Sequence, residues 1–360
     1  TVKYMLRNNE VDEAEKIFLL FIREDISHKI QEIVDIQATW YMCERGHAYR
    51  RLGDVGRALR QFHQAIDVFA AYHHDQLDFH AYSVRKATLR TYVDILEWET
   101  TILTHPFYGD AARSAIECYI ELHDCKQAGS PLRAIPDVKD TKPLTRNGTA
   151  QHGQHHLSAG LEEVKVASVD VDPSGATLVD ADDHLARALE LVERLEAAVG
   201  SQAETHVLAF EVHLRMRKYF LVLKAINALK TIDADHPALA PMAVRLGKAL
   251  DADEAFAAPM KAALKGQLAK SFGDVSIEAS VASHPASFDH ALAAAKGLLA
   301  LGDTNAARAI LLQAASEAHG RTVTGLLAAS QLLEKSGATA EERDMLAASA
   351  KKAFPLAACF

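Results

Sequence analysis

The stretch Met42–Ile66, MCERGHAYRRLGDVGRALRQFHQAI, decides the fold of this chain. Its small and aromatic residues have the spacing of two antiparallel helices joined by a tight turn. They are Gly46 and Tyr49 in the first helix, Leu52-Gly53 in the turn, and Ala58, Phe62 and Ala65 in the second helix. Small residues are needed where two such helices cross closely, and aromatic residues fill the groove between neighbouring helix pairs. The stretch therefore predicts one unit of a helical repeat.

Weaker copies of this pattern occur on either side of it. Residues 6–18, LRNNEVDEAEKIF, resemble a second helix with its preceding turn, and residues 293–314 repeat the pattern around the turn residue Gly302. Residues 204–237 have the same helix-turn-helix length and end at Pro237, but they lack the turn glycine. We therefore predict an all-α fold, a tetratricopeptide-type superhelix of helical repeats that forms a right-handed α-solenoid.

The segment Asp78–Tyr108, DFHAYSVRKATLRTYVDILEWETTILTHPFY, interrupts the repeat pattern. We expect one helix that Asp78 caps at its N-terminus and that ends at His105-Pro106, where the proline opens the next helix. Its apolar residues recur at helical spacing, and we expect them to pack internally. They are Phe79, Tyr82, Leu89, Val93 and Leu96.

Composition excludes several classes of protein. The 360 residues carry a formal net charge of −9, which argues against a nucleic-acid binder that uses its whole surface, so any polyanion site must be local. The sequence has no run of eighteen or more apolar residues, so we expect no membrane span. The four cysteines lack the spacing of a zinc site and are typical of reduced thiols in a cytoplasmic protein. Because the chain begins TVKYMLRNNE, we expect a fragment of a longer protein.

The sequence predicts three parts. Residues 1–128 should form helical repeats that include the clear unit and the DFHxYxxRK helix, and residues 181–360 should form a second block of helical repeats. Between them, residues 129–180 are rich in Pro, Gly, Ser, Thr and His, which is the composition of a flexible linker. Only VKVASVDVDP, residues 164–173, alternates with the period of a strand.

No catalytic site is evident. Residues 50–56, RRLGDVG, come near the Arg/Gln-x-x-Gly-x-Gly/Ala signature that holds the pyrophosphate of acetyl-coenzyme A, but Val55 stands where a second small residue is needed. A repeat turn explains these residues better. His152, His155 and His156 have a spacing that could bind a metal, yet they lack acidic or cysteine ligands nearby, so a solvated tract is favoured. We expect neither a catalytic residue nor a metal site.

Two cationic clusters are candidates for a polyphosphate site. Lys3 and Arg7 are four residues apart on one helical face, and Arg85, Lys86 and Arg90 form the second cluster. Two helices that presented such clusters to one concave surface could hold a polyphosphate by charge-assisted hydrogen bonds. The alternative is that each cluster faces solvent, as most surface charges do.

Trp40 is a candidate partner contact. Ile36 precedes it by four residues, so the two could form an apolar ridge that points away from the repeat core. Tryptophan is enriched among the residues that dominate protein interfaces, and burial against a neighbouring helix is the alternative. The sequence leaves both interpretations open.

Five stretches together resemble one protein family. They are KYMLRNNEVDEAEKIF (residues 3–18), the repeat that contains Trp40, DQLDFHAYSVRKATLRTYVDILEWE (75–99), HPFYGDAARSAIECYIELHD (105–124), and ETHVLAFEVHLRMRKYFLVL (204–223) with DADHP (233–237). They look like the C-terminal half of the auxiliary subunit of the N-terminal acetyltransferase A complex. The motif DFHxYxxRKxxLRxYVD is specific, since it is not general tetratricopeptide sequence.

The resemblance implies a noncatalytic scaffold without a cofactor of its own, which binds the catalytic acetyltransferase subunit and anchors it at the ribosome. It implies that Trp40 and Ile36 pack on that subunit, and that Lys3 and Arg7 help to hold inositol hexakisphosphate between the subunits. A small inhibitory or regulatory protein is a further expected partner, and a membrane is not. The assignment of Arg85, Lys86 and Arg90 to the polyphosphate site is our own addition.

One feature departs from the family. Its members usually carry a long Lys/Glu-rich segment between the two helical blocks, a candidate for contact with ribosomal RNA, whereas residues 129–180 contain few Lys or Arg residues. The alternative function comes from another class of protein. It is a general tetratricopeptide adaptor that binds peptide segments in its concave groove.

Overall fold

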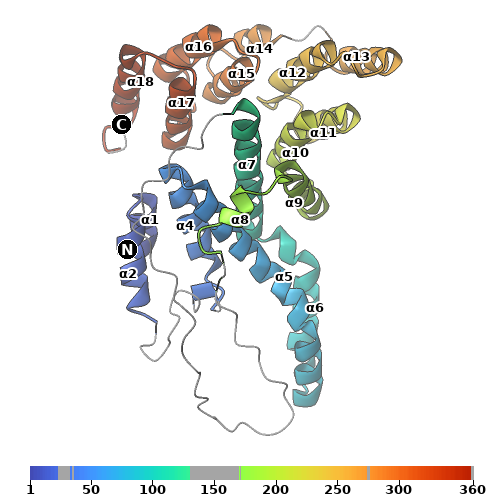
Figure 1. The fold of residues 1–360 in the computed structure, drawn as a ribbon, viewed down its shortest axis with the longest axis vertical. Coiled ribbons are helices and arrows are strands. Elements are labelled where there is room, and N and C mark those ends of the chain that lie inside the picture. Colours follow the sequence, from blue (N-terminus) through green and yellow to red (C-terminus); the bar gives the residue numbers. More distant parts are fainter. Residues whose placement is uncertain (23–32, 35, 130–169, 171, 274–275, 358–360) are drawn as a thin grey trace. The chain divides into compact units, whose positions relative to one another are not determined.

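The computed structural model describes residues 1–22, 33–34, 36–129, 170, 172–273 and 276–357. Within these ranges the regular elements are helical, apart from one isolated β-bridge between Ser287 and His319. The prediction of an all-α fold is therefore confirmed for the described residues. The chain divides into two compact units, Thr1–Val199 and Gly200–Phe360 (Figure 1).

The first unit is a stack of antiparallel helices in which α4 packs on α5, α5 on α7, and α7 on α9. Near its N-terminus α1 packs on α2 and α4. Its described elements are α1 (Val2–Arg7), α2 (Val11–Leu19), α4 (Thr39–Leu52), α5 (Val55–Lys86), α6 (Leu89–Thr101), the 3₁₀ helix η1 (Ile102–Thr104), α7 (Pro106–Ala128), α8 (Ala176–Val179) and α9 (His184–Val199).

The predicted repeat unit is confirmed by α4 and α5. Gly53 ends α4 with a φ of 86°, a left-handed conformation that favours glycine. Asp54 then caps α5, because its side chain accepts a hydrogen bond from the backbone N–H of Arg57 at 3.0 Å. The small and aromatic positions of the pattern, Gly46 and Phe62 among them, are buried between the two helices.

The expected helix start at Asp78 is wrong. The single helix α5 runs through this position to Lys86, because no glycine or proline interrupts it between Val55 and that residue except Gly56 in its first turn. The chain turns at Ala87, which has a φ of 56°, and α6 begins at Leu89. The expectation of a single helix up to His105 is also wrong, since the segment is divided at Ala87 and α6 ends at Thr101, where η1 follows. The predicted start of the next helix is confirmed: His105 caps α7, Pro106 is its first residue, and Nδ1 of His105 accepts a hydrogen bond from the backbone N–H of Phe107 at 3.2 Å.

The segment after residue 129 is described only at its end, since residues 130–169 and 171 lie outside the described ranges, as does most of the expected strand. Asp170 contacts α5: its carboxylate accepts hydrogen bonds from Nε and Nη2 of Arg60 at 2.8 and 2.7 Å, and from Gln64 at 2.9 Å. The turn at Gly175 then packs against Gly56, since a Cβ atom on Gly175 would lie 2.0 Å from the Gly56 carbonyl oxygen. Residues 170 and 172–180 thus belong to the first unit, and α9 follows in the same unit.

The second unit is also built from helix pairs. The helix α10 packs on α11 and α12, and α12 packs on α14 and α15. Further along, α15 packs on α16 and α17, and α18 packs on α16 and α17. Its helices are α10 (Ala203–Arg215), α11 (Tyr219–Ile232), α12 (Leu239–Ala252), α13 (Ala258–Phe272), α14 (Ile277–Ser283), α15 (Phe288–Ala300), α16 (Thr304–Glu317), α17 (Val323–Lys335) and α18 (Ala340–Ala353).

Two turns of this unit bear out the repeat pattern. Between α15 and α16, Gly302 has a φ of 84° and Asp303 caps the next helix by accepting a hydrogen bond from the N–H of Ala306 at 3.1 Å. This is the same turn as the one formed by Gly53 and Asp54. Between α10 and α11 the turn glycine is absent, and Arg217 adopts the left-handed conformation with a φ of 55°. The repeat formed by α10 and α11 therefore keeps the left-handed turn, although this conformation costs free energy for a residue other than glycine.

Candidate partner-binding surfaces

The first candidate surface lies on α1 and α4, where Lys3 and Arg7 meet Glu44. Arg7 donates hydrogen bonds to the Glu44 carboxylate from Nε at 3.1 Å and from Nη2 at 2.8 Å, and Nζ of Lys3 lies 3.3 Å from it. Burial acts to raise the pKa of Glu44, but the bonds from Arg7 and Lys3 outweigh it and hold the pKa below its ordinary value. The predicted pair therefore shares one face, as expected, and is bound to an acidic residue that the sequence pattern did not reveal.

Arg51 extends this cationic surface. Its Nη2 donates to the backbone carbonyl of Leu6 at 2.8 Å and its Nε to the side chain of Asn9 at 2.8 Å. The pKa of Arg51 is lowered, first by burial and further by the charge of Arg7, with Glu44 acting in the opposite direction. Lys3 and Arg7 thus contact the Glu44 carboxylate, and Arg51 adds a third positive charge close enough to Arg7 to be affected by it.

Trp40 is half-buried rather than either fully exposed or fully covered. Its ring packs edge-on against the rings of Phe18 and Tyr41, with both centroids 5.8 Å away. Ile36 is 52% exposed, but it precedes the first residue of α4, Thr39. The two residues are therefore not one turn apart on a single helix, and the expected ridge along one helix is not formed. Each still offers apolar surface beside the start of α4.

The second candidate surface lies on the last turns of α5 and on α6, and we call it the α5–α6 surface. Four of its apolar side chains are 41% to 59% exposed, namely Tyr82, Leu89, Val93 and Trp98. The expectation that Tyr82, Leu89 and Val93 pack internally is therefore wrong. Because the chain turns at Ala87, Tyr82 and Leu89 do not lie on one continuous helix, and the main contacts of α6 among the described elements are with α5 and η1. Exposed apolar surface of this extent is typical of an interaction site.

The second cationic cluster borders the α5–α6 surface. Arg85 and Lys86 are the last residues of α5, and Arg90 is in the first turn of α6. All three side chains are exposed, and none forms an ion pair within the part of the chain that the structure describes. Figure 1 shows α6 far from α1, so the two predicted cationic clusters do not converge on one site.

Catalytic chemistry has no support in the loop 50–56. Arg50 forms an ion pair with Glu117, Asp54 caps α5, and Gly56 faces the backbone of Ser174 and Gly175, so the loop is occupied by structural contacts. The repeat-turn interpretation is confirmed. The histidine tract at residues 152–156 lies outside the described residues.

Cys43 and His47 are one turn apart on α4, and Nε2 of His47 lies 2.9 Å from the Asp110 carboxylate. Burial, however, raises the pKa of the Cys43 thiol to about 12, and that of Cys118 to about 12 as well. A thiol with such a pKa is protonated at neutral pH and is a poor nucleophile. The described cysteines are thus free thiols, and two of the three are buried.

None of the described helices combines the length and the apolar character needed to cross a bilayer.

Comparisons with known proteins agree on one family. The sequence model described as "N-terminal acetyltransferase A, auxiliary subunit" matches residues 1–134 and 137–229. The Arabidopsis thaliana protein described as N-terminal acetyltransferase A complex auxiliary subunit NAA15 is 32% identical over 259 residues, which cover 66% of this chain and 28% of the relative. The Homo sapiens N-alpha-acetyltransferase 16, NatA auxiliary subunit, is 29% identical over 345 residues, which cover 86% of this chain and 39% of the relative.

A solved structure agrees with both. The structure of Naa15/Naa10 bound to HypK-THB has a chain that matches this one with a TM-score of 0.59 and 26% sequence identity, over 75% of this chain and 34% of that one. This match confirms the prediction of stacked tetratricopeptide-type helix pairs, because the matched chain has that fold. The chain spans 28% to 39% of the length of the relatives described above.

Proposed function

This chain belongs to the family of auxiliary subunits of N-terminal acetyltransferase A, and from that premise we propose that it is part of a noncatalytic scaffold that binds and activates the catalytic subunit of the complex. The related solved structure pairs the auxiliary subunit Naa15 with Naa10. We propose a partner of the Naa10 type for this chain, and co-translational acetylation of nascent chains as the process that it serves.

The observation that carries this proposal is the α5–α6 surface. Half-exposed apolar side chains lie on it together with three exposed cations that form no ion pair among the described residues, inside the part of the sequence that the family model matches. Burial of apolar area would supply the binding free energy, and the cations would orient an acidic patch of the partner. Trp40 and Ile36 at the start of α4 offer a second contact for the same partner.

A scaffold of this kind acts without an acid, base or nucleophile of its own. It changes the activity of the bound enzyme by contacting one conformation of it better than another, so that this conformation becomes more populated. The buried thiols and the structurally occupied loop at Arg50 fit this role, because neither leaves a reactive group in a cavity.

The test is co-expression with the catalytic subunit of the same organism, followed by affinity measurement. The double substitution Leu89→Ser with Val93→Ser should weaken binding at least tenfold, and Trp40→Ala should weaken it as well. Unbound chains of the α5–α6 variant should keep the wild-type melting temperature, since both side chains are about half exposed.

The matched control is Met260→Ser with Met345→Ser, which removes two exposed apolar side chains of the second unit, 48% and 60% exposed. This variant should bind as wild type does. The proposal is overturned if the α5–α6 variant and Trp40→Ala both bind the catalytic subunit with unchanged affinity. Tight binding of short peptides by the isolated chain would instead favour an adaptor function.

We further propose that inositol hexakisphosphate binds beside Lys3 and Arg7, at the edge that the catalytic subunit would cover. The cations beside Glu44 support this, since Arg51 adds a third one to Lys3 and Arg7. Arg85, Lys86 and Arg90 lie on the other surface and are assigned to the protein partner. A ribosome contact in the cytoplasm, and a regulatory protein such as the HypK segment of the related structure, complete the proposed set of partners.

A further inference from the structure

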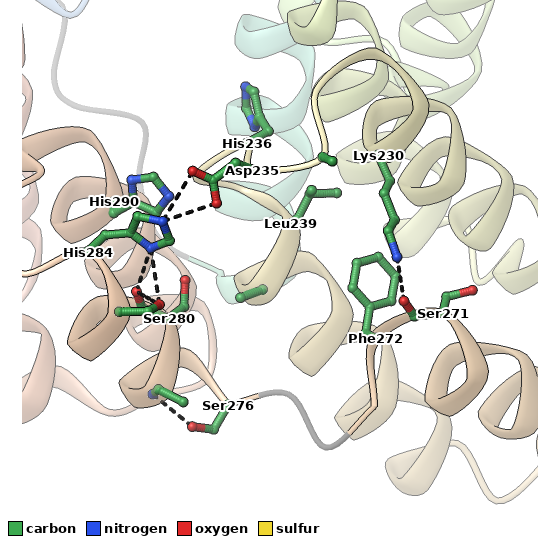
Figure 2. Close-up of a pocket in the computed structure, with 14 residues that line it drawn as sticks. Lys230, Asp235, His236, Leu239, Ser271, Phe272, Ser276, Ser280, His284 and His290 are labelled. Atoms are coloured by element: carbon green, nitrogen blue, oxygen red, sulfur yellow. Dashed lines mark hydrogen bonds and ion pairs between the residues drawn. The ribbon is translucent and has the colours of Figure 1, made fainter.

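Three metal-ligand side chains meet in the second unit, whereas both candidate surfaces belong to the first. Asp235 lies in the loop between α11 and α12, His284 directly follows α14, and His290 is in the first turn of α15. One ligand atom of each residue lies within 4.8 Å of those of the other two. Figure 2 shows the Asp235 carboxylate pointing at the His284 ring, with the His290 ring beside it.

The hydrogen bonds of His284 fix which nitrogen faces the carboxylate. Nδ1 lies 3.1 Å from the carbonyl oxygen of Ser280, which can only accept, so Nδ1 carries the hydrogen. Nε2 lies 3.1 Å from Oδ1 and 3.2 Å from Oδ2 of Asp235. By the same argument, a hydrogen on Nε2 points at the Asp235 carboxylate in the metal-free chain. An ion that replaced this hydrogen would lie between Nε2 and the carboxylate, while Nδ1 kept its bond to the backbone carbonyl, as in a metal-ligating histidine.

His290 is held by a hydroxyl group instead of a carbonyl. Its Nδ1 lies 2.9 Å from Oγ of Ser287, and the same hydroxyl caps α15 by accepting from the backbone N–H of His290 at 3.4 Å. The rings of His284 and His290 are stacked, with centroids 3.9 Å apart and planes at 11°. The lone pair of a ring nitrogen lies in the plane of its ring, so two parallel stacked rings do not direct their lone pairs at one point. One of the two rings must therefore tilt before both can bind the same ion. Both rings are only partly buried, which leaves room for this rotation.

From this geometry we propose that Asp235, His284 and His290 form a binding site for a zinc-class divalent ion. Two imidazole nitrogens and one carboxylate oxygen are the donor set of such ions, whereas Ca²⁺ and Mg²⁺ prefer oxygen ligands alone. The three protein ligands leave a fourth position for water. The cluster lines a cavity of about 370 Å³, which gives that position access to solvent.

The ion would tie together three segments of the second unit. The ligands come from the α11–α12 loop, the end of α14 and the start of α15, and within this unit α12 packs on both α14 and α15. A ligand that binds only the folded chain stabilises it by mass action. Zn²⁺ should therefore raise the melting temperature, and it should do so only while the three ligands are present.

The test is titration of ZnCl₂ into the metal-free full chain in the presence of a competing chromophoric chelator, which suppresses weak surface sites. Wild type should bind one equivalent of Zn²⁺, and Co²⁺ should bind in its place with the visible absorption of a coordinated ion. His284→Ala and Asp235→Asn should each weaken the affinity at least tenfold. Asp235 is exposed, so its substitution leaves the fold intact even if a histidine variant unfolds.

Two controls identify the site. His236→Gln removes a histidine that lines the same cavity outside the cluster and should keep the affinity. The triple substitution His152→Asn, His155→Asn and His156→Asn removes the rival histidine tract and should also keep it. The proposal is overturned if wild type binds no Zn²⁺ in competition with the chelator, or if the triple histidine variant no longer binds Zn²⁺. It is also overturned if Ca²⁺ displaces the chelator as well as Zn²⁺ does.

Discussion

Gly46 of α4 and Phe62 of α5 lie so close that a Cβ atom on Gly46 would be 2.6 Å from Cε1 and 2.9 Å from Cζ of the Phe62 ring. The Phe62 side chain is fully buried, so its ring cannot move aside without disturbing the core of the first unit. The small residue of the repeat pattern is therefore required by the crossing of these two helices.

Gly46→Ala should destabilise the first unit by roughly 2 kcal/mol, because the cost of overpacking exceeds the gain in helix propensity. Gly247→Ala is the matched control, since a Cβ atom on this helical glycine would have nothing within 4 Å. That substitution should instead stabilise by up to about 1 kcal/mol. Chemical denaturation of both variants measures the two changes in the free energy of unfolding. The packing argument would be contradicted if both substitutions changed this free energy in the same direction.

Gly175→Ala should loosen the contact of residues 172–180 with α5. The new Cβ would lie 2.0 Å from the Gly56 carbonyl oxygen, and the residue has a φ of 69°. Gly129→Ala is the control for the backbone conformation alone, because Gly129 has a φ of 60° and a Cβ atom there would have nothing within 4 Å. Limited proteolysis should cut the Gly175 variant faster near this segment. Equal cleavage of the two variants would show that the close contact is unimportant.

The stability of the first unit should fall as the pH falls from about 6.5 to 4. Burial, and then the charges of Arg187, Arg60 and Arg194, lower the pKa of His63 to about 4, while in the unfolded chain it is near 6.5. Between these values the unfolded chain binds a proton that the folded chain does not, so the free energy of unfolding decreases with decreasing pH. The full effect is roughly 3 kcal/mol.

The substitution His63→Gln removes the titrating imidazole. It leaves a side chain that can hydrogen-bond the Tyr119 hydroxyl, which lies 2.6 Å from Nε2 of His63. Denaturation measured at several pH values should give a shallower pH dependence for this variant than for wild type. His319→Gln, at an exposed histidine, should leave the dependence unchanged. The attribution to His63 fails if its variant has the wild-type slope.

Glu211→Gln should destabilise the second unit by roughly 2–3 kcal/mol at neutral pH, because Arg245 and Arg215 would lose their anionic partner. Nη2 of Arg245 donates to Glu211 at 2.8 Å and Nη1 of Arg215 at 2.6 Å. Burial acts to raise the pKa of Glu211, but these two guanidinium groups outweigh it and lower the pKa to about 2.

Since that pKa is depressed, the stabilisation by Glu211 is present above about pH 4.5 and is lost as the pH falls toward 2. The difference between wild type and Glu211→Gln should shrink over the same range. Glu254→Gln, at an exposed position, should change stability by less than about 0.5 kcal/mol. A pH-independent difference between wild type and the Glu211 variant would point to packing instead of charge.

Inositol hexakisphosphate should bind the Lys3–Arg7 surface. The double substitution Lys3→Ala with Arg7→Ala should weaken its affinity at least tenfold in calorimetry on the complex with the catalytic subunit, whereas Glu44→Gln should strengthen it by removing a competing carboxylate. The comparison variant is Arg85→Ala with Lys86→Ala and Arg90→Ala, a cluster on the other surface, measured at a concentration of catalytic subunit that keeps both variants fully in the complex. Loss of binding in the comparison variant alone would reverse the assignment.

Local sequence was enough to predict the repeat unit. The Gly46–Phe62 crossing, the turn at Gly53 and the proline start of α7 each depend on residues close together in the chain, and all are found in the structure. Turn and capping preferences act over a few residues, so a pattern in one segment specifies them. The start of a helix at Asp78 failed because continuation of α5 was equally compatible with the residues there.

Contacts between distant segments were decided only by the tertiary structure. The sequence could not show that Glu44 holds Lys3 and Arg7, or that Asp170 reaches across 110 residues to Arg60. It also could not show that Asp235 and His284 meet across 49 residues, or that the side chains of Leu89 and Val93 stay uncovered. Helical periodicity says which residues share a face of a helix, but only the packing of the neighbouring helices determines what, if anything, covers that face.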